Sequence, residues 1–146
     1  MPERPASAVA RTVLAFDFGL KRIGVALGNT ITGSARPLGT IEEESNDSRF
    51  SAISSRIAQW EPDLLVVGKP LDSEGRDTDM TARAERFGRQ LAGRFGLPVE
   101  FADERFSSAV VESALKPNRD NKALVDAAAA AVILQAWLDE THHAHS

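Results

Sequence analysis

The sequence has no cysteine among its 146 residues. This absence excludes disulfide bonds, thiolate nucleophiles and cysteine-ligated zinc, and it permits a reducing compartment, so we expect a cytoplasmic protein. Long hydrophobic runs are absent as well. The polar stretch 1–11 lacks the apolar core of a signal peptide, and no segment approaches the roughly 20 apolar residues that span a bilayer. Secretion and membrane insertion are therefore not expected.

An excess of positive charge is also absent. Seventeen Lys and Arg against 21 Asp and Glu give a net charge of −4, the wrong sign for a protein that holds nucleic acid by bulk electrostatics. Any polyanion must therefore be held by a local patch. The length suits one hydrophobic core, and we expect one domain over 12–140 with a flexible arm at 1–11 and a flexible tail at 141–146.

Apolar runs bounded by turns alternate along the chain with apolar residues at helical spacing, which predicts an α/β protein. The expected strands are Thr12–Phe18, Arg22–Gly28, Ala35–Ile41, Leu64–Gly68 and Val99–Ala102, and the expected helices are Asp47–Trp60, Asp79–Phe95, 107–115 and Lys122–Glu140. Pro37 places the third strand at an edge, because proline cannot donate a ladder hydrogen bond.

The connections between these elements predict the topology. Strands joined by short turns must be antiparallel, whereas strands separated by helices are joined by crossovers and run parallel. The result is a mixed five-stranded sheet flanked by helices, with the first three strands antiparallel and the first and fourth side by side. Asp17, Gly68 and the triplet 103–105 then emerge at one edge, where open α/β sheets bind ligands.

Asp17 is the single charge in the first strand and stands where the apolar run stops. Burial of a carboxylate costs several kcal/mol unless it is paired or bound to a cation. Asp17 therefore either accepts hydrogen bonds from its own turn or pairs with Lys21 or Arg22, or it ligates Mg²⁺ or Mn²⁺, which prefer oxygen donors.

Two further acids are expected near the same edge: Glu104, with Asp103 as the alternative beside it, and Asp126 in the first turn of the last helix. Each has an ordinary explanation by itself. Glu104 can be a surface residue beside Arg105, and Asp126 can be favoured by the helix dipole or paired with Lys122. Together, three separate elements each bring one acid to the edge, as metal-assisted hydrolysis requires.

Basic residues flank the predicted edge and would suit a phosphodiester. The candidate phosphate-contacting residues are Lys21, Arg22, Lys69, Arg76, Arg83, Arg105 and Lys122. Each of them can equally be a solubilising surface charge. Arg83, Arg86, Arg89 and Arg94 share the second predicted helix and suggest a further phosphate-contacting face. The chain carries neither a G-x-G-x-x-G fingerprint nor a Walker loop, so no nucleotide cofactor is indicated.

Four ordered segments carry a resemblance to a known family: AFDFGLKRIGVALG (15–28), VVGKPLDSEGRDTDMTARAERF (66–87), LPVEFADERFSS (97–108) and KALVDAAAAAVILQAWL (122–138). The chain resembles the YqgF (RuvX-like) proteins, described as Holliday-junction resolvases and as pre-16S ribosomal RNA nucleases. The resemblance implies an RNase H-like fold and divalent-metal hydrolysis of a phosphodiester. It also implies that Asp17, Glu104 and Asp126 are the catalytic acids and metal ligands.

The sequence thus predicts a Mg²⁺- or Mn²⁺-dependent endonuclease that acts in processing the 5′ end of pre-16S rRNA. The partner would be structured RNA, or alternatively a four-way DNA junction if the protein is a Holliday-junction resolvase. The acidic net charge favours another alternative, a non-catalytic RNA- or ribosome-binding module of the same fold. An actin-like ATPase is disfavoured because it needs two such domains. The number of metals and the oligomeric state, a homodimer included, stay open.

Overall fold

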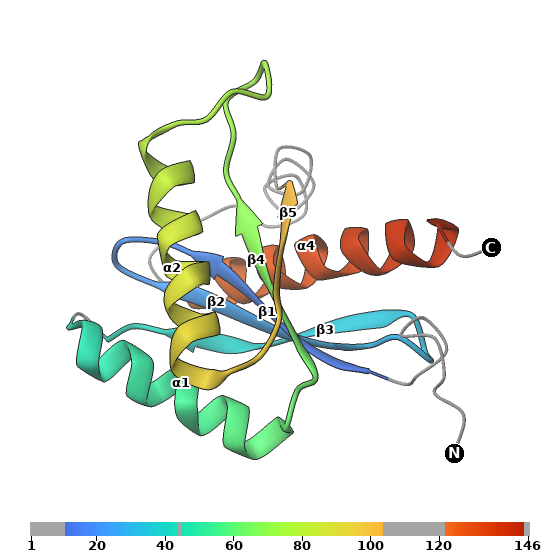
Figure 1. The fold of residues 1–146 in the computed structure, drawn as a ribbon, viewed down its shortest axis with the longest axis horizontal. Helices are drawn as coiled ribbons and strands as arrows, with labels where there is room; N and C mark the ends of the chain where they lie inside the picture. The colour runs from blue at the N-terminus through green and yellow to red at the C-terminus, as the bar shows by residue number, and fades with distance from the viewer. Residues whose placement is uncertain (1–10, 44, 104–121, 145–146) are drawn as a thin grey trace.

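A computed structural model describes residues 11–43, 45–103 and 122–144, with only the backbone described for 122–125 and 141–144. In chain order the elements are β1 (Thr12–Phe18), β2 (Ile23–Asn29), β3 (Ser34–Ile41), α1 (Asn46–Trp60), β4 (Leu64–Lys69), α2 (Asp79–Phe95), β5 (Val99–Asp103) and α4 (Lys122–Ala144) (Figure 1). The helix expected over 107–115 lies outside the described residues. No helix in the described part is both long enough and apolar enough to cross a membrane.

The five strands form one mixed sheet in the order β3-β2-β1-β4-β5. The pairs β1–β2 and β2–β3 are antiparallel, whereas β1–β4 and β4–β5 are parallel. The predicted mixed sheet, with β1 beside β4, is therefore confirmed. Pro37 lies in the edge strand β3, as expected, and the ladder between β2 and β3 shifts register between Val25 and Ala26.

Side chains alternate between the two faces of the sheet, so the protein has two hydrophobic clusters. Leu14 and Phe16 of β1 lie in the cluster under α1 and α2, whereas Val13 and Ala15 lie in the cluster under α4. Figure 1 shows α1 and α2 on one side of the sheet and α4 on the other. The alternation places Asp17 on the α4 face, because successive residues of a strand point to opposite faces.

Helix α4 lies close against β2 because β2 presents glycines to it. A Cβ at Gly28 would lie 2.8 Å from Leu134 Cδ2, and a Cβ at Gly24 would meet the α4 backbone. Gln135 of α4 fastens the β2–β3 hairpin to the helix. Its amide donates to the Gly33 carbonyl at 2.8 Å and accepts from the Ala35 N–H at 3.0 Å.

The elements differ from the expected ranges mainly at their ends. β4 and β5 each run one residue further, because Lys69 and Asp103 are register partners and prolong the ladder. α4 runs four residues beyond Glu140, into the segment expected to be a flexible tail. No proline or glycine follows Glu140 to stop the helix.

Candidate active site

Asp17 is the penultimate residue of β1 and is half-buried on the α4 face of the sheet. Its partner in β2 is Gly24. On the other side, Val67 of β4 pairs with Phe16, so Gly68 follows next to Asp17. Because both of these neighbours are glycines, neither strand places a side chain beside the Asp17 carboxylate on this face.

Asp126 reaches the same place from α4. A Cβ at Gly24 would lie 2.0 Å from the Asp126 carbonyl oxygen and 3.2 Å from the Ala127 N, so the helix backbone rests directly on the glycine. Cα atoms of paired residues in antiparallel strands lie only about 4.5–5.5 Å apart. Gly24 is therefore the one residue between Asp17 in β1 and the backbone of Asp126 in α4.

The Asp126 carboxylate binds Arg22, which lies between the β1–β2 turn and β2. Arg22 Nε is 2.5 Å from Asp126 Oδ2, and the two side chains are 29% and 25% exposed. The interpretation that the helix dipole accounts for Asp126 is wrong, because α4 begins at Lys122 and no acid lies in its first turn. Asp126 is instead held by a cation that is distant in the sequence.

Arg49 of α1 supports the β1–β2 turn from the opposite face of the sheet. This buried side chain donates to the Leu20 carbonyl in the turn and to the Glu43 carbonyl at 2.8 Å, and it lies 5.9 Å from the Phe18 ring centroid. Burial lowers the pKa of the Arg49 guanidinium from its ordinary value. The turn that carries Arg22 is thus tied to α1.

Arg49 was not among the site residues predicted from the sequence, although its position on α1 carried a signal. Arg49 precedes Ile53 by four residues, so it falls on the inward stripe of α1 where an apolar residue is usual. A charged residue at such a position needs polar partners within reach, and the carbonyls of the neighbouring turn supply them.

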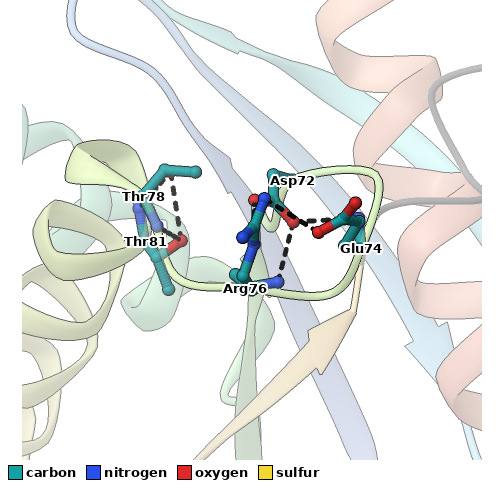
Figure 2. Close-up of polar contacts among 5 residues, drawn as sticks. All are labelled: Asp72, Glu74, Arg76, Thr78 and Thr81. Carbon is teal, nitrogen blue, oxygen red and sulfur yellow. Dashed lines mark hydrogen bonds and ion pairs between the residues drawn. The ribbon is translucent and has the colours of Figure 1, made fainter.

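The loop between β4 and α2 extends beyond the sheet and is closed by its own charges (Figure 1, Figure 2). Asp72 Oδ1 accepts from the backbone N–H groups of Glu74 and Arg76 at 2.9 and 2.8 Å. The Arg76 guanidinium lies 3.0 Å from Asp72 Oδ2 and 2.8 Å from Glu74 Oε2. Gly75 adopts a φ of +83°, which the tight turn requires. Two carboxylates therefore already engage Arg76, a predicted phosphate contact.

Thr81 anchors the other end of this loop. Its buried hydroxyl donates to the Pro70 carbonyl, and it forms a reciprocal capping box with Thr78 at the start of α2 (Figure 2). The N-terminus of α2 is therefore tied to the end of β4. A Thr three residues after the N-cap, where Glu or Gln is more usual, is the sequence signal that was missed.

The other predicted phosphate contacts are spread around the edge. Lys21 is exposed in the β1–β2 turn, and Arg83 is exposed on α2. Lys69 is half-buried at the end of β4, and strand alternation places it on the α1–α2 face, opposite Asp17. Lys21 and Arg22 are thus nearest to the acids, whereas Lys69 and Arg83 belong to the other side of the sheet.

Three predicted site residues are beyond what the structure describes. Glu104 and Arg105 lie outside the described residues, and Lys122 is described only as the first backbone residue of α4. Asp103, the alternative to Glu104, is the last residue of β5 and is exposed. In the sheet order, β5 is two strands from β1, which is about 10 Å at the usual strand spacing.

The residues present fit a hard divalent cation. Asp17 and Asp126 carry carboxylate oxygens, the donors that suit Mg²⁺ or Mn²⁺, and only Gly24 lies between Asp17 and the Asp126 backbone. Among the described residues, no three Asp, Glu, His or Cys side chains come together as a metal-binding group. The described part of the site therefore supplies two carboxylates.

The family model for RuvX, described as Holliday junction resolvase, matches residues 11–140. A protein of Dechloromonas aromatica is 52% identical over 136 residues, covering 90% of this chain and 93% of its own. One of Burkholderia cenocepacia is 50% identical over 145 residues, covering 96% and 97%. Both are named "Putative pre-16S rRNA nuclease". The resemblance read from the four sequence segments is confirmed.

Solved structures of resolvases share the fold. The Fowlpox virus resolvase, solved with substrate Holliday junction DNA, matches with a TM-score of 0.55 and 12% identity, over 88% of this chain and 97% of its own. Thermus thermophilus RuvC, in complex with a Holliday junction substrate, matches with a TM-score of 0.52 and 18% identity, over 90% and 95%. The RNase H-like fold predicted from the sequence is confirmed.

Proposed function

The chain belongs to the RuvX family, and from this premise we propose that it is a divalent-metal-dependent endonuclease that hydrolyses nucleic-acid phosphodiesters. One observation carries the proposal. The backbone of Asp126 rests on Gly24, the strand partner of Asp17, so one acidic residue from each end of the chain lies at the same edge of the sheet, which supports a shared site. Such a carboxylate pair is what a hydrolytic metal centre needs.

The residues divide into ligands and phosphate contacts. Asp17 and Asp126, with Glu104, would hold Mg²⁺ or Mn²⁺, and the bound ion would supply an activated water and neutralise charge on the phosphate. Asp17 is the proposed central ligand, because it lies at the end of the buried strand β1, next to the Gly24 on which Asp126 rests. Lys21 and Arg22, in the adjoining turn, are the cations best placed to bind the phosphate.

The proposed substrate is structured RNA at the 5′ end of pre-16S rRNA, which places the action in the cytoplasm. The names of the two half-identical relatives support this choice. A four-way DNA junction is the second candidate substrate, and the RuvX description favours it. Cleavage of a symmetric junction would call for a homodimer, whereas cleavage at one RNA site would not.

A basic face on α2 offers a second place for the phosphate backbone. Arg83, Arg86 and Arg89 are exposed on this helix, and in the described part of the chain no ion pair engages them. Arg94 differs, because its guanidinium lies 4.0 Å from the Phe50 ring centroid. A face of unpaired arginines gives a chain of negative net charge the local patch that a polyanion requires.

Asp17→Asn tests the proposed function. We expect it to lower Mn²⁺-dependent cleavage by about 100-fold or more, because the variant removes the charge of the central ligand. The substrates are a 5′-extended 16S precursor RNA and a four-way DNA junction, assayed in parallel. Asp63→Asn is the matched control, because Asp63 is exposed beside Thr12, at the opposite end of β1 from Asp17, and asparagine can still accept from the Thr12 N–H.

Each outcome discriminates between the candidates. Cleavage of only the precursor RNA supports the rRNA nuclease, and cleavage of only the junction supports the resolvase. Full activity of Asp17→Asn would remove Asp17 from the metal site. Tight RNA binding without cleavage by the wild-type protein would favour the non-catalytic RNA-binding module.

A further inference from the structure

The ion pair between Arg22 and Asp126 lies inside the proposed metal site. We propose that Arg22 is a placeholder cation, whose guanidinium holds the Asp126 carboxylate and must leave it before a divalent ion can bind there. The inference rests on the proposed function, because it concerns the same two acids. It assigns Arg22 a role that a simple phosphate contact would not have.

Electrostatics makes the two cations competitors. Arg22 Nε lies 2.5 Å from Asp126 Oδ2, so a divalent ion on either oxygen of this carboxylate would lie within a few ångströms of the guanidinium. Two positive charges at such a separation repel each other, and partial burial leaves less water to screen them. Both side chains are less than one-third exposed. Metal and guanidinium therefore exclude each other from this position.

The backbone around Arg22 is fixed, whereas its side chain can turn. The ladder pairs Phe18 with Ile23 and Asp17 with Gly24, and Arg49 holds the preceding turn through the Leu20 carbonyl. Arg22 adjoins this ladder, so its Cα stays at the site edge in either arrangement. Rotation about the side-chain bonds is enough to move the guanidinium from Asp126 toward solvent.

The guanidinium that leaves Asp126 has a new partner in the substrate. Its planar fork binds phosphate oxygens well, and the scissile phosphate would be bound beside the same carboxylates. The exchange replaces one carboxylate–guanidinium contact by a carboxylate–metal contact and a phosphate–guanidinium contact. Arg22 thereby keeps the Asp126 carboxylate paired in the resting protein and joins substrate binding when the metal arrives.

Mn²⁺ binding to the full chain, measured by calorimetry and by the electron paramagnetic resonance signal of free Mn²⁺, tests the proposal without any activity assay. We expect Arg22→Gln to bind Mn²⁺ about threefold to tenfold more tightly than the wild type, the size of a partly buried ion pair removed. Arg22→Lys keeps the charge and should stay close to the wild-type affinity. Lys21→Gln removes the same charge from the exposed neighbouring position and should change the affinity less than about twofold.

A second variant ties the effect to Asp126. Asp126→Asn should weaken Mn²⁺ binding, and Arg22→Gln should then no longer strengthen it. Circular dichroism and thermal melts of every variant check that it is folded, and Arg22→Lys provides the comparison if Arg22→Gln melts early.

The outcomes separate this inference from the proposed function. If the wild type binds Mn²⁺ and Arg22→Gln binds it equally or more weakly, Arg22 merely orients Asp126, and the placeholder role is overturned while the metal site stands. If neither the wild type nor any variant binds Mn²⁺, the metal-dependent function itself is overturned, and the placeholder role with it.

Discussion

Two clusters of opposite charges lie at the same edge of the sheet, and they differ in almost every physical respect. Arg22 and Asp126 are 104 residues apart in the sequence and partly buried. Arg76 and its partner Asp72 are four residues apart, and the Arg76 side chain is 71% exposed. The first pair joins α4 to the β1–β2 turn, whereas the second closes a single loop.

Ion pairs therefore serve two purposes in this protein: one shapes a single loop, and the other joins distant elements. A local, hydrated cluster shapes the backbone that contains it and contributes little to stability, because water competes for each charge. A long-range, partly buried pair depends on the whole fold. The loss of water around its charges offsets part of their attraction, so a ligand can compete for one of the partners. Changes that act on one cluster and spare the other test this distinction.

The largest expected loss of stability comes from Gly24→Ala, which changes the glycine on which the Asp126 backbone rests. Its new Cβ would lie 2.0 Å from a backbone oxygen of α4, so the helix must move away, at a cost of about 2–4 kcal/mol in unfolding free energy. Gly28→Ala is the matched control, because the atoms nearest to its new Cβ belong to the side chains of Leu134 and Leu138 and not to the α4 backbone. If Gly24→Ala and Gly28→Ala lost equal amounts of unfolding free energy in urea, contact with the α4 backbone would not be the reason for the loss at Gly24.

The second-largest effect is expected from Arg49→Met, which removes the support that α1 gives to the β1–β2 turn. We expect a loss of about 2 kcal/mol, because the Leu20 and Glu43 carbonyls lose a buried charged donor. Urea denaturation measures it, with the exposed Arg86→Met on α2 as the control, for which the change should stay under about 0.5 kcal/mol. If the urea midpoint of Arg49→Met equalled that of the wild type, the β1–β2 turn would be stable without Arg49.

A double-mutant cycle of Arg22→Gln and Asp126→Asn measures the long-range pair itself. We expect a coupling of about 1 kcal/mol in unfolding free energy, the upper range for pairs with access to water. High salt should reduce the coupling only partly, because the side chains are mostly shielded from solvent. A coupling near zero would contradict the view that this pair links α4 to the turn.

The smallest effect is expected from the equivalent cycle of Arg76→Gln and Asp72→Asn in the β4–α2 loop. Its coupling should be below about 0.5 kcal/mol and should vanish at high salt, because Arg76 is largely exposed. Hydrogen exchange of the Glu74 and Arg76 amides, which donate to Asp72, should quicken in Asp72→Asn. If this coupling equalled that of Arg22 and Asp126, the contrast between the clusters would disappear.

Much of the fold could be read from the sequence because it depends on neighbouring residues. The apolar run Thr12–Phe18 predicted β1 with its bounds, and the helix expected over Asp79–Phe95 matches α2 at both ends. Pro37 predicted the edge strand. The position of Asp126 was misjudged, because α4 begins at Lys122 and thus puts this acid beyond its first turn. Helix ends depend on capping and tertiary contacts as well as on periodicity.

The site was predictable as a set of acids but not as a set of contacts. Short turns and crossovers are enough to bring Asp17 and its neighbours to one edge, and the sequence therefore indicated where to look. Arg22 was considered as a partner for Asp17, and in the structure it forms an ion pair with Asp126. Arg49 and Thr81 were overlooked because their partners are backbone carbonyls, which no residue pattern displays.

Residues close together in the chain were enough to predict the strands, the antiparallel pairing of the first three through short turns, and β1 beside β4 through a crossover. The tertiary structure alone decided that Arg22 binds Asp126. That contact requires α4 to lie on Gly24, and the closeness of a helix to a strand depends on packing across the whole sheet. Local geometry is encoded by neighbouring residues, whereas charges 104 residues apart meet only after the core has formed.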